Sequence, residues 1–268
     1  MQLRETENLP NQAQKKLRQF LGNLSGTSSR VLMLDYDGTL APFCAQRQLA
    51  GPYPEIPSLL KQILTDTNTR LTIVTGRRAE EIGKLVQIEE IETWGCQGLE
   101  RITDSQYWLA TIDKPLLERI EEAEELLRKA GLVDLLDPKP GAIAIHWRGS
   151  SLSPEEVATS VKKVWARLPS REGLHLVNFD GGLEIRTRKR NKGDVVRTII
   201  DEMPQRTAIA YLGDDQTDED AFAALQGFGL GVLVRPLYRP TVADVWIRPP
   251  EGVISFLENW IRTCRGGS

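Results

Sequence analysis

Apolar and polar positions in the first third of the chain alternate between short strands and amphipathic helices. Apolar runs short enough for strands buried on both faces of a parallel sheet occur at 31–35, 71–75 and near 93–94. Helical spacing of apolar residues predicts a polar lead-in helix over about 12–24 and further helices over 55–65 and 79–87. Strands that alternate with helices in this way indicate a parallel, doubly wound α/β sheet.

The middle of the chain follows a different pattern, because two of its strands are joined by a hairpin. Helices are predicted over 114–129 and from Pro154 to near Pro169, and strands over 142–148, 174–179 and 183–187. The segment Asp180-Gly181-Gly182 between the last two strands is typical of a hairpin turn. We therefore expect a separate α+β module over 103–188.

The alternating pattern resumes after this module. Helices are predicted over 192–203, about 218–225 and 253–262, with strands over 207–212, 231–234 and 244–247. Residues 1–102 and 189–268 are thus expected to form one α/β core, a Rossmann-like, doubly wound parallel sheet that the α+β module interrupts.

Composition and charge narrow the classes of partner. The 268 residues are 40% hydrophobic and 26% charged, which is ordinary for a globular protein. A net charge of −3 gives no reason to expect nucleic acid or an anionic membrane as partner, so an anionic substrate needs a local basic cluster. Three scattered cysteines do not suggest a disulfide framework. Without an apolar leader or a run of membrane-spanning length, a cytoplasmic protein is expected, and a monomer is plausible.

Asp35 and Asp37 end the first predicted core strand, directly before a Gly38-Thr39 turn. Because strand side chains alternate, both carboxylates can point the same way at the carboxyl end of the strand, where open α/β sheets bind ligands. Two close carboxylates repel one another unless a cation such as Mg2+ lies between them. For this pair alone, an acidic strand-to-loop turn without function is an equal alternative.

Three further groups of polar residues follow predicted core strands or open core helices. Thr75-Gly76-Arg77 offers a hydroxyl, backbone N–H groups and a guanidinium to an anion, and Lys192 opens a helix. Five acids lie within 213–220, among them Asp214, Asp215 and Asp218. A common turn, a solvated lysine and a helix start that favours acids would explain each group singly. Together with Asp35 and Asp37, they favour an oxygen-rich Mg2+ site.

These segments resemble, in chain order, the four motifs of the haloacid dehalogenase superfamily of phosphatases. They are Asp35-Tyr36-Asp37-Gly38-Thr39, Thr75-Gly76-Arg77, Lys192-Gly193 and Gly213-Asp214-Asp215-Gln216-Thr217-Asp218-Glu219-Asp220. Within the superfamily, the resemblance is closest to the trehalose-6-phosphate phosphatases. It rests on the string 211–222 and on the module pattern Lys139, His146-Trp147-Arg148 and Leu183-Glu184-Ile185-Arg186, and it covers nearly all of the chain beyond residue 30.

The resemblance implies a Mg2+-dependent phosphatase in which Asp35 is the nucleophile and Asp37 the general acid and base. Thr75 and Lys192 would bind the phosphoryl oxygens. The implied metal ligands are Asp35, the backbone carbonyl of Asp37 and Asp214, with Asp215 or Asp218 in support. The module would be a cap over the site. The implied substrate-binding residues are Arg77, Lys139, His146, Arg148 and Glu184, and the partner would be a small sugar phosphate.

Each module residue also has a structural interpretation. His146 and Arg148 share one face of an alternating strand, which could be the solvent side of an antiparallel sheet. Glu184 could pair with Arg186 or Lys139. His175 matches no motif and is expected at the surface.

Two departures from the family pattern affect the expected substrate. Gln97 stands in Gly95-Cys96-Gln97-Gly98, where the family commonly has a histidine, and Asp180 aligns where a lysine is frequent. A related glycosyl phosphate, such as glucosylglycerol phosphate, is therefore an alternative substrate. Two further hypotheses for the function are a non-catalytic sugar-phosphate sensor and a phosphotransferase that acts on a second sugar.

Overall fold

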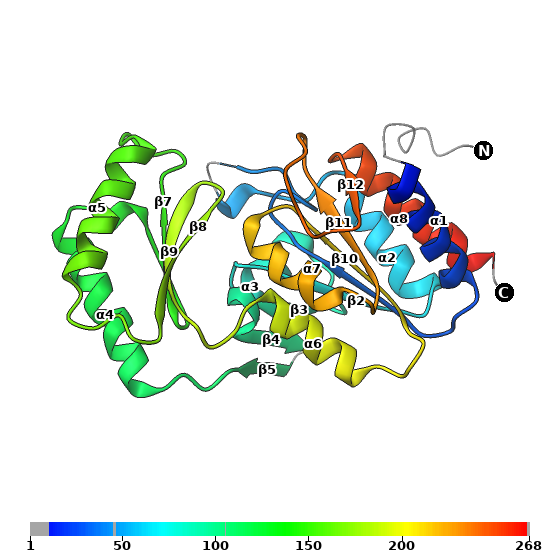
Figure 1. Ribbon diagram of the computed structural model, residues 1–268, viewed down its shortest axis with the longest axis horizontal. Coiled ribbons are helices and arrows are strands. Elements are labelled where there is room, and N and C mark those ends of the chain that lie inside the picture. Colours follow the sequence, from blue (N-terminus) through cyan, green and yellow to red (C-terminus); the bar gives the residue numbers. More distant parts are fainter. Residues whose placement is uncertain (1–10, 45–46, 105, 267–268) are drawn as a thin grey trace.

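The protein, described here by a computed structural model for residues 11–44, 47–104 and 106–266, contains two β-sheets that lie side by side (Figure 1). The larger sheet has eight strands in the order β12-β11-β10-β1-β2-β3-β4-β5, and the smaller has four in the order β6-β7-β9-β8. The predicted fold class, a doubly wound α/β sheet with an inserted α+β module, is confirmed.

Strand β1 lies at the centre of the larger sheet, between β10 and β2, and all five of its residues are buried. All neighbouring strands from β12 to β3 run parallel, whereas β3, β4 and β5 are joined by antiparallel pairing. The strands are β12 (Val245–Ile247), β11 (Leu230–Val234), β10 (Ala208–Gly213), β1 (Arg30–Leu34), β2 (Thr69–Val74), β3 (Glu92–Gly95), β4 (Glu100–Thr103) and β5 (Gln106–Leu109). The chain leaves β1 towards β2 on one side and returns to β10 on the other, so β1 marks the topological switch point, where such sheets bind ligands.

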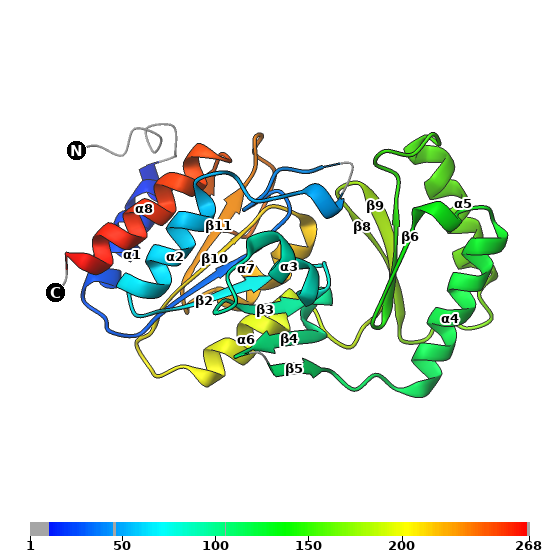
Figure 2. The ribbon, with the colours of Figure 1, turned by 180° about the vertical axis from the view of Figure 1, so that it is seen from behind.

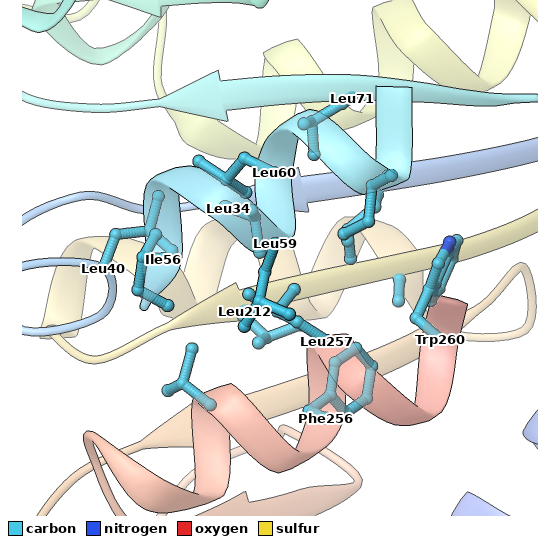
Figure 3. Close-up of a cluster of buried hydrophobic side chains, with 14 of the residues drawn as sticks. Leu34, Leu40, Ile56, Leu59, Leu60, Leu71, Leu212, Phe256, Leu257 and Trp260 are labelled. Atoms are coloured by element: carbon cyan, nitrogen blue, oxygen red, sulfur yellow. The ribbon is translucent and has the colours of Figure 1, made fainter. Parts of the chain in front are cut away.

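Helices cover both faces of the larger sheet. Buried side chains of α1 (Asn11–Ser25), α2 (Ile56–Asp66), α3 (Ala79–Val86) and α8 (Glu251–Arg265) share one apolar cluster on the first face. Figure 3 shows part of it, with Leu60 beside Leu34 of β1 and Leu257 beside Leu212 of β10. Helices α6 (Lys192–Glu202) and α7 (Glu219–Leu225) bury their apolar sides against the second face. The central strand is therefore fixed from both sides.

The smaller sheet is antiparallel and carries its two helices on the face away from the larger sheet (Figure 2). Its elements are α4 (Lys114–Lys129), β6 (Leu136–Lys139), β7 (Ala142–His146), α5 (Pro154–Arg167), β8 (Leu174–Phe179) and β9 (Gly182–Thr187). A capping box between Ser153 and Glu156 begins α5. Ile143 and Ile185 point into the apolar cluster beneath the helices. Because strand side chains alternate, His146 and Glu184 point to the opposite face, towards the core.

The structure differs from the expected module boundary at one end. Residues 106–109 form β5 at the edge of the larger sheet, although the sequence analysis assigned the module from residue 103. All four β5 residues are exposed, so the apolar alternation that reveals a half-buried strand is missing. Strand β6 was also not predicted, and it contains Pro138. Short helical turns lie at Arg47–Leu49, Cys96–Gly98, Val133–Leu135 and Gln216–Asp218. Over the described ranges, no helix is long and apolar enough to cross a membrane.

Candidate active site

A cavity of about 120 Å3 lies where the carboxyl ends of β1, β2 and β10 face the smaller sheet. Almost all residues that the sequence analysis selected line this cavity. They are Asp35, Asp37, Thr75, Arg77, Lys139, His146, Arg148, Glu184, Lys192, Asp214 and Asp215. Asp218 does not line the cavity and lies fully buried next to Asp35 and Lys192. The folded chain thus brings together residues that are up to 183 positions apart, from Asp35 to Asp218.

Lys192 connects two buried carboxylates at the core end of the cavity. Its ammonium donates hydrogen bonds to Asp35 Oδ1 at 2.6 Å and to Asp218 Oδ1 at 2.7 Å. Asn191 caps α6 and thereby fixes where Lys192 begins the helix. Burial raises the pKa of Asp35 to about 7, although the Lys192 charge acts to lower it. Burial alone would lower the pKa of Lys192, but Asp218 and Asp35 raise it, so the lysine stays charged.

Asp218 is fully engaged in hydrogen bonds. Besides Lys192, its Oδ1 accepts the Tyr211 hydroxyl at 2.5 Å, and its Oδ2 accepts the backbone N–H groups of Asp214 and Asp215 at 3.1 and 2.9 Å. Four donors on one carboxylate occupy most of its acceptor capacity. Asp218 therefore holds the loop after β10 in shape and orients the lysine.

Asp214, in contrast, has no hydrogen bond to its carboxylate oxygens from any residue in the described ranges, and it is 2% exposed. Arg235 Nη1 lies 3.9 Å from Oδ2. Burial raises the pKa of Asp214 well above its ordinary value, and the charges of Asp35 and Asp218 raise it further. Gly38, with φ +83°, closes over this side chain, since a Cβ there would overlap the Asp214 carboxylate.

The three buried carboxylates fit a divalent cation. Oxygens of Asp35, Asp214 and Asp218 lie within 4.8 Å of one another; Lys192 contacts two of these carboxylates, and Arg235 approaches the third only to 3.9 Å. A buried carboxylate without a hydrogen bond is costly, and a hard cation with oxygen ligands removes that cost. Because Asp218 is occupied by four donors, the oxygens open to a cation are those of Asp214 and the second oxygen of Asp35.

Asp37 is held by a paired arginine. Arg77, which is 1% exposed, donates from Nε to Asp37 Oδ2 at 2.7 Å and from Nη2 to Oδ1 at 2.6 Å. Burial acts to raise the pKa of Asp37, but the hydrogen bonds and charge of Arg77, with the charges of Arg47 and Lys139, lower it. The third Arg77 nitrogen donates to the Arg47 carbonyl at 2.8 Å. In this arrangement, Arg77 fixes Asp37 in its ionised form.

The turn 75–77 forms hydrogen bonds both with the turn Cys96–Gly98 of the core and with the smaller sheet. Thr75 Oγ1 accepts the Arg77 N–H at 3.1 Å, and the Thr75 carbonyl accepts the Gln97 N–H at 2.9 Å. Lys139 reaches across from β6 and donates to the Gly76 carbonyl at 2.9 Å. One short core segment therefore contacts both walls of the cavity.

Glu184 and Lys139 form the buried centre of the smaller sheet's inner face. Glu184 is 5% exposed, its Oε1 lies 3.5 Å from Lys139 Nζ, and its Oε2 lies 3.8 Å from Arg186. Both pairings considered for Glu184 in the sequence are thus present. Neither is within normal hydrogen-bond distance, so the Glu184 carboxylate keeps acceptor capacity directed at the cavity.

His146 and Arg148 face the cavity, so they are not on a solvent-facing side of the sheet. His146 Nε2 lies 2.8 Å from Arg47 Nη1 and 3.4 Å from Asp137 Oδ2, and Arg47 also pairs with Asp137. Burial lowers the pKa of His146, as do the charges of Arg47 and Lys139, against the hydrogen bond to Asp137. These contacts join the core loop at Arg47 to the smaller sheet.

Arg148 belongs to a second junction between the two sheets. It donates to Asp180 Oδ1 at 2.6 Å and lies over the Phe43 ring, with Cζ 4.0 Å from the ring centroid. The Asp180 backbone N–H in turn donates to Asp215 Oδ2 at 3.2 Å. Where the family frequently has a lysine, Asp180 therefore places a carboxylate at the cavity wall, paired with Arg148.

Sequence reasoning missed several residues of the site. Arg47 and Phe43 lie in a proline-rich loop without periodicity, and Asp137 lies in the unpredicted strand β6. Tyr211 is part of the string that carried the resemblance, but its hydroxyl contact with Asp218 had no signal of its own. These residues act through contacts between distant segments, which a single sequence does not display.

The family model and the most similar relatives and structures named below include trehalose-phosphate phosphatases in every comparison. The trehalose-phosphatase family model matches residues 33–239. Trehalose-phosphate phosphatase B of Arabidopsis thaliana is 30% identical over 257 residues, which cover 88% of this chain and 67% of that protein. The C-terminal domain of C. albicans trehalose-6-phosphate phosphatase is similar in fold, with a TM-score of 0.76 and 20% identity over 92% of this chain and 96% of that one. A haloacid dehalogenase-like hydrolase from B. subtilis has a TM-score of 0.59 at 17% identity, over 85% of this chain and 99% of that one.

Proposed function

The chain belongs to the trehalose-phosphatase family, and we propose that it hydrolyses trehalose 6-phosphate to trehalose and phosphate. We call the smaller sheet with α4 and α5 the cap. One observation carries the proposal: the same cavity is lined by the buried pair Asp35 and Lys192 from the core and by Lys139 and Glu184 from the cap. The core pair suits a phosphoryl group, and the cap pair suits sugar hydroxyls.

In the proposed mechanism, Asp35 attacks phosphorus and forms an aspartyl-phosphate while the sugar oxygen leaves. Lys192, which stays charged beside Asp35, reduces the repulsion between the nucleophile and the incoming phosphate. Thr75 lies at the same edge and offers its hydroxyl to the phosphoryl oxygens, while its backbone N–H already donates to the Trp94 carbonyl. Water then hydrolyses the aspartyl-phosphate and regenerates Asp35.

Asp37 would transfer the protons of both steps. As general acid, it protonates the leaving sugar oxygen, and as general base, it then deprotonates the attacking water. Its pairing with Arg77 lowers its pKa and favours the ionised form, which is the form that the second step needs. The first step needs a protonated Asp37, so we propose that the pairing with Arg77 loosens when substrate phosphate draws on the guanidinium and that Asp37 then takes up a proton from solvent. Asp37 gives this proton to the leaving oxygen and receives one from the attacking water, and Arg77 orients it in both steps.

The fit of the buried carboxylates supports Mg2+ as the cofactor. The proposed ligands are Asp35, the Asp37 backbone carbonyl and Asp214. Asp215 and Asp218, also expected as ligands, have hydrogen bonds to their carboxylates, so we assign them to shaping the loop that carries Asp214. When bound, Mg2+ would neutralise phosphoryl charge and help align the attack.

The cap is proposed to open and close over the substrate. A cavity of about 120 Å3 is small, since pockets for drug-sized ligands measure about 300–1,000 Å3. We therefore interpret the described arrangement as closed, with Lys139, Arg47 and Asp180 forming contacts between core and cap. Closure would exclude bulk water from the reaction.

Two cavity residues bear on the identity of the substrate. Gln97 and Asp180 both line the cavity, which keeps a related glycosyl phosphate as the second candidate. A sensor without catalysis is disfavoured, because Asp35, Asp37 and Lys192 all lie in the same cavity. A phosphotransferase would differ only in the acceptor. A cytoplasmic location, a monomeric state and the absence of nucleic-acid and membrane partners stay predictions.

A phosphate-release assay tests the proposal directly. Trehalose 6-phosphate, glucosylglycerol phosphate, glucose 6-phosphate and p-nitrophenyl phosphate would be compared with Mg2+ and with EDTA. We expect the highest kcat/KM for trehalose 6-phosphate and no turnover in EDTA. Preference for another glycosyl phosphate would keep the phosphatase and replace the substrate, and turnover of none would reject both.

A further inference from the structure

Gln97 is a buried side chain in the cavity with unused hydrogen-bonding capacity. It is 9% exposed, lines the cavity, and its Oε1 has no hydrogen-bond partner among the described residues. Of the described residues with such an unpaired buried atom, only Gln97 lines the cavity. Buried polar groups are normally paired, and an exception in a cavity points to a ligand. We propose that Gln97 is a specificity-determining residue whose Oε1 accepts a hydrogen bond from a sugar hydroxyl of the substrate.

The backbone holds Gln97 in a conformation that few non-glycine residues adopt. Gln97 has φ +58° and the preceding Cys96 has φ +49°, both in the left-handed region. A side chain in this region is strained, so the surrounding structure must hold it there. Hydrogen bonds from Cys96 N–H to the Arg77 carbonyl and from Gln97 N–H to the Thr75 carbonyl hold the turn. The segment from Thr75 to Arg77 therefore holds the backbone from which the Gln97 side chain extends.

The amide of Gln97 lies at the junction between core and cap. It lies against Gly76, where a Cβ would be 2.8 Å from Gln97 Nε2. The carbonyl of the same glycine accepts the Lys139 ammonium, which lies 3.5 Å from Glu184. Gln97 thus lies beside the cap residues assigned to the sugar.

The chemistry of the unpaired atom identifies which part of the substrate it meets. An amide oxygen can only accept hydrogen bonds. A phosphate monoester near neutral pH is ionised and presents mainly acceptor oxygens, whereas every free sugar hydroxyl can donate. The partner of Oε1 is therefore a hydroxyl of the glycosyl part. This inference rests on the proposed function, because it requires a sugar phosphate as substrate.

The test is the substitution Gln97→Met, which keeps an unbranched chain of similar size but removes both polar atoms. Gln87→Met is the matched control, because Gln87 is also in the left-handed conformation, with φ +55°, but is exposed and outside the cavity. We expect Gln97→Met to lower kcat/KM for trehalose 6-phosphate by about 3- to 10-fold, the range for one neutral hydrogen bond. For p-nitrophenyl phosphate, which has no sugar hydroxyl, kcat/KM should change by less than about 2-fold.

The outcomes separate this inference from the proposed function. Equal losses on both substrates, or no loss on trehalose 6-phosphate in a variant with a wild-type melting temperature, would overturn the role of Gln97. If wild type does not hydrolyse trehalose 6-phosphate, the proposed substrate fails, and the ratio is measured with whichever glycosyl phosphate it does hydrolyse. If Gln97→Met lowers kcat/KM for that glycosyl phosphate but not for p-nitrophenyl phosphate, the proposed role of Gln97 is supported. If wild type hydrolyses no sugar phosphate, Gln97 loses its role as well.

Discussion

The two sheets of the molecule meet at one cavity but contribute to it in different ways. The larger sheet supplies Asp35 and Asp214 from the ends of adjacent parallel strands, with Lys192 from a helix that begins at the same edge. These residues are buried and contact one another within the core. The smaller sheet supplies Lys139, which donates to a core carbonyl across the cavity.

The site therefore has a part that does not depend on the position of the cap and a conditional part that exists only while the cap contacts the core. The contact of Lys192 with Asp35 needs nothing from the cap, so the core end should keep its geometry when the cap opens. The contacts of Lys139 with Gly76, and of Asp180 with Asp215, exist only while core and cap are together. We expect substitutions at Asp35, Lys192 and Asp214 to affect every substrate alike, and substitutions of the cap residues, like that of Gln97 at the junction with the cap, to affect mainly substrates with a sugar.

The largest effect is expected for Asp35→Asn, at the core end. An amide cannot form the acyl-phosphate, and no other group replaces the nucleophile, so kcat should fall by about 10³-fold or more. The fall should be equal for trehalose 6-phosphate and p-nitrophenyl phosphate, measured by phosphate release. Lys192 keeps Asp218 as a partner, so the variant should remain folded. A folded variant that retains more than about a tenth of wild-type kcat would contradict the assignment.

Asp214→Asn should separate activity from stability in the same core. Loss of a proposed metal ligand should abolish most activity on both substrates, as EDTA should for wild type. In metal-free protein, however, the variant should melt at a higher temperature than wild type, because it removes a buried carboxylate that has no hydrogen bond among the described residues.

Asp220→Asn is the control for this experiment, because Asp220 lies in the same acidic segment but is exposed. It should change neither activity nor melting temperature.

Added Mg2+ should raise the melting temperature of wild type and leave that of Asp214→Asn nearly unchanged, since only the protein that binds the ion is stabilised by it. Full wild-type activity after thorough chelation would reject the metal site.

Glu184→Ala tests the conditional part of the site. A carboxylate that accepts from sugar hydroxyls contributes about 1.5–3 kcal/mol, which corresponds to roughly 10- to 100-fold in kcat/KM for trehalose 6-phosphate. Hydrolysis of p-nitrophenyl phosphate should be much less affected. Exposed Glu155 on α5 provides the control Glu155→Ala. Proportional losses on both substrates with a lower melting temperature would mean that Glu184 serves only to pair with Lys139 and Arg186.

The same contrast explains what the sequence could predict. Asp35, Asp37, Thr75 and Asp214 lie directly after apolar strands, so strand alternation and the parallel sheet place them at one edge. Their convergence in one cavity was predictable from these local patterns. The cap residues Lys139, His146, Arg148 and Glu184 were selected by family resemblance, because alternation says which face they share but not what that face meets.

Contacts between distant segments could not be predicted. Nothing local to Arg47 indicates that its side chain pairs with Asp137, 90 residues later, while its carbonyl accepts Arg77. The four donors on Asp218 likewise depend on how the loop after β10 folds back on itself. The edge strand β5 escaped prediction because exposed positions carry no burial pattern.

The smallest effect is expected from the junction at Arg47, through the pH dependence of stability. Burial and nearby positive charge lower the pKa of His146 below its ordinary value of 6.5. The unfolded chain therefore takes up a proton at a higher pH than the folded protein does. Stability is fully present above about pH 6.5 and is lost as the pH falls through the lowered pKa. In His146→Gln, the melting temperature should fall less between about pH 7.5 and about pH 5.5 than in wild type.

The control is His175→Gln, the only other histidine of the chain, which lies on β8 outside the cavity. Burial and the charges of Arg188 and Arg186 also lower the pKa of His175, so its substitution gives the contribution of a histidine that does not contact the core. A reduced acid slope only in His146→Gln assigns the effect to the burial of His146 beside the positive charges at the junction of core and cap. Equal slopes in wild type and His146→Gln would show that this histidine does not couple protonation to the closed arrangement of core and cap.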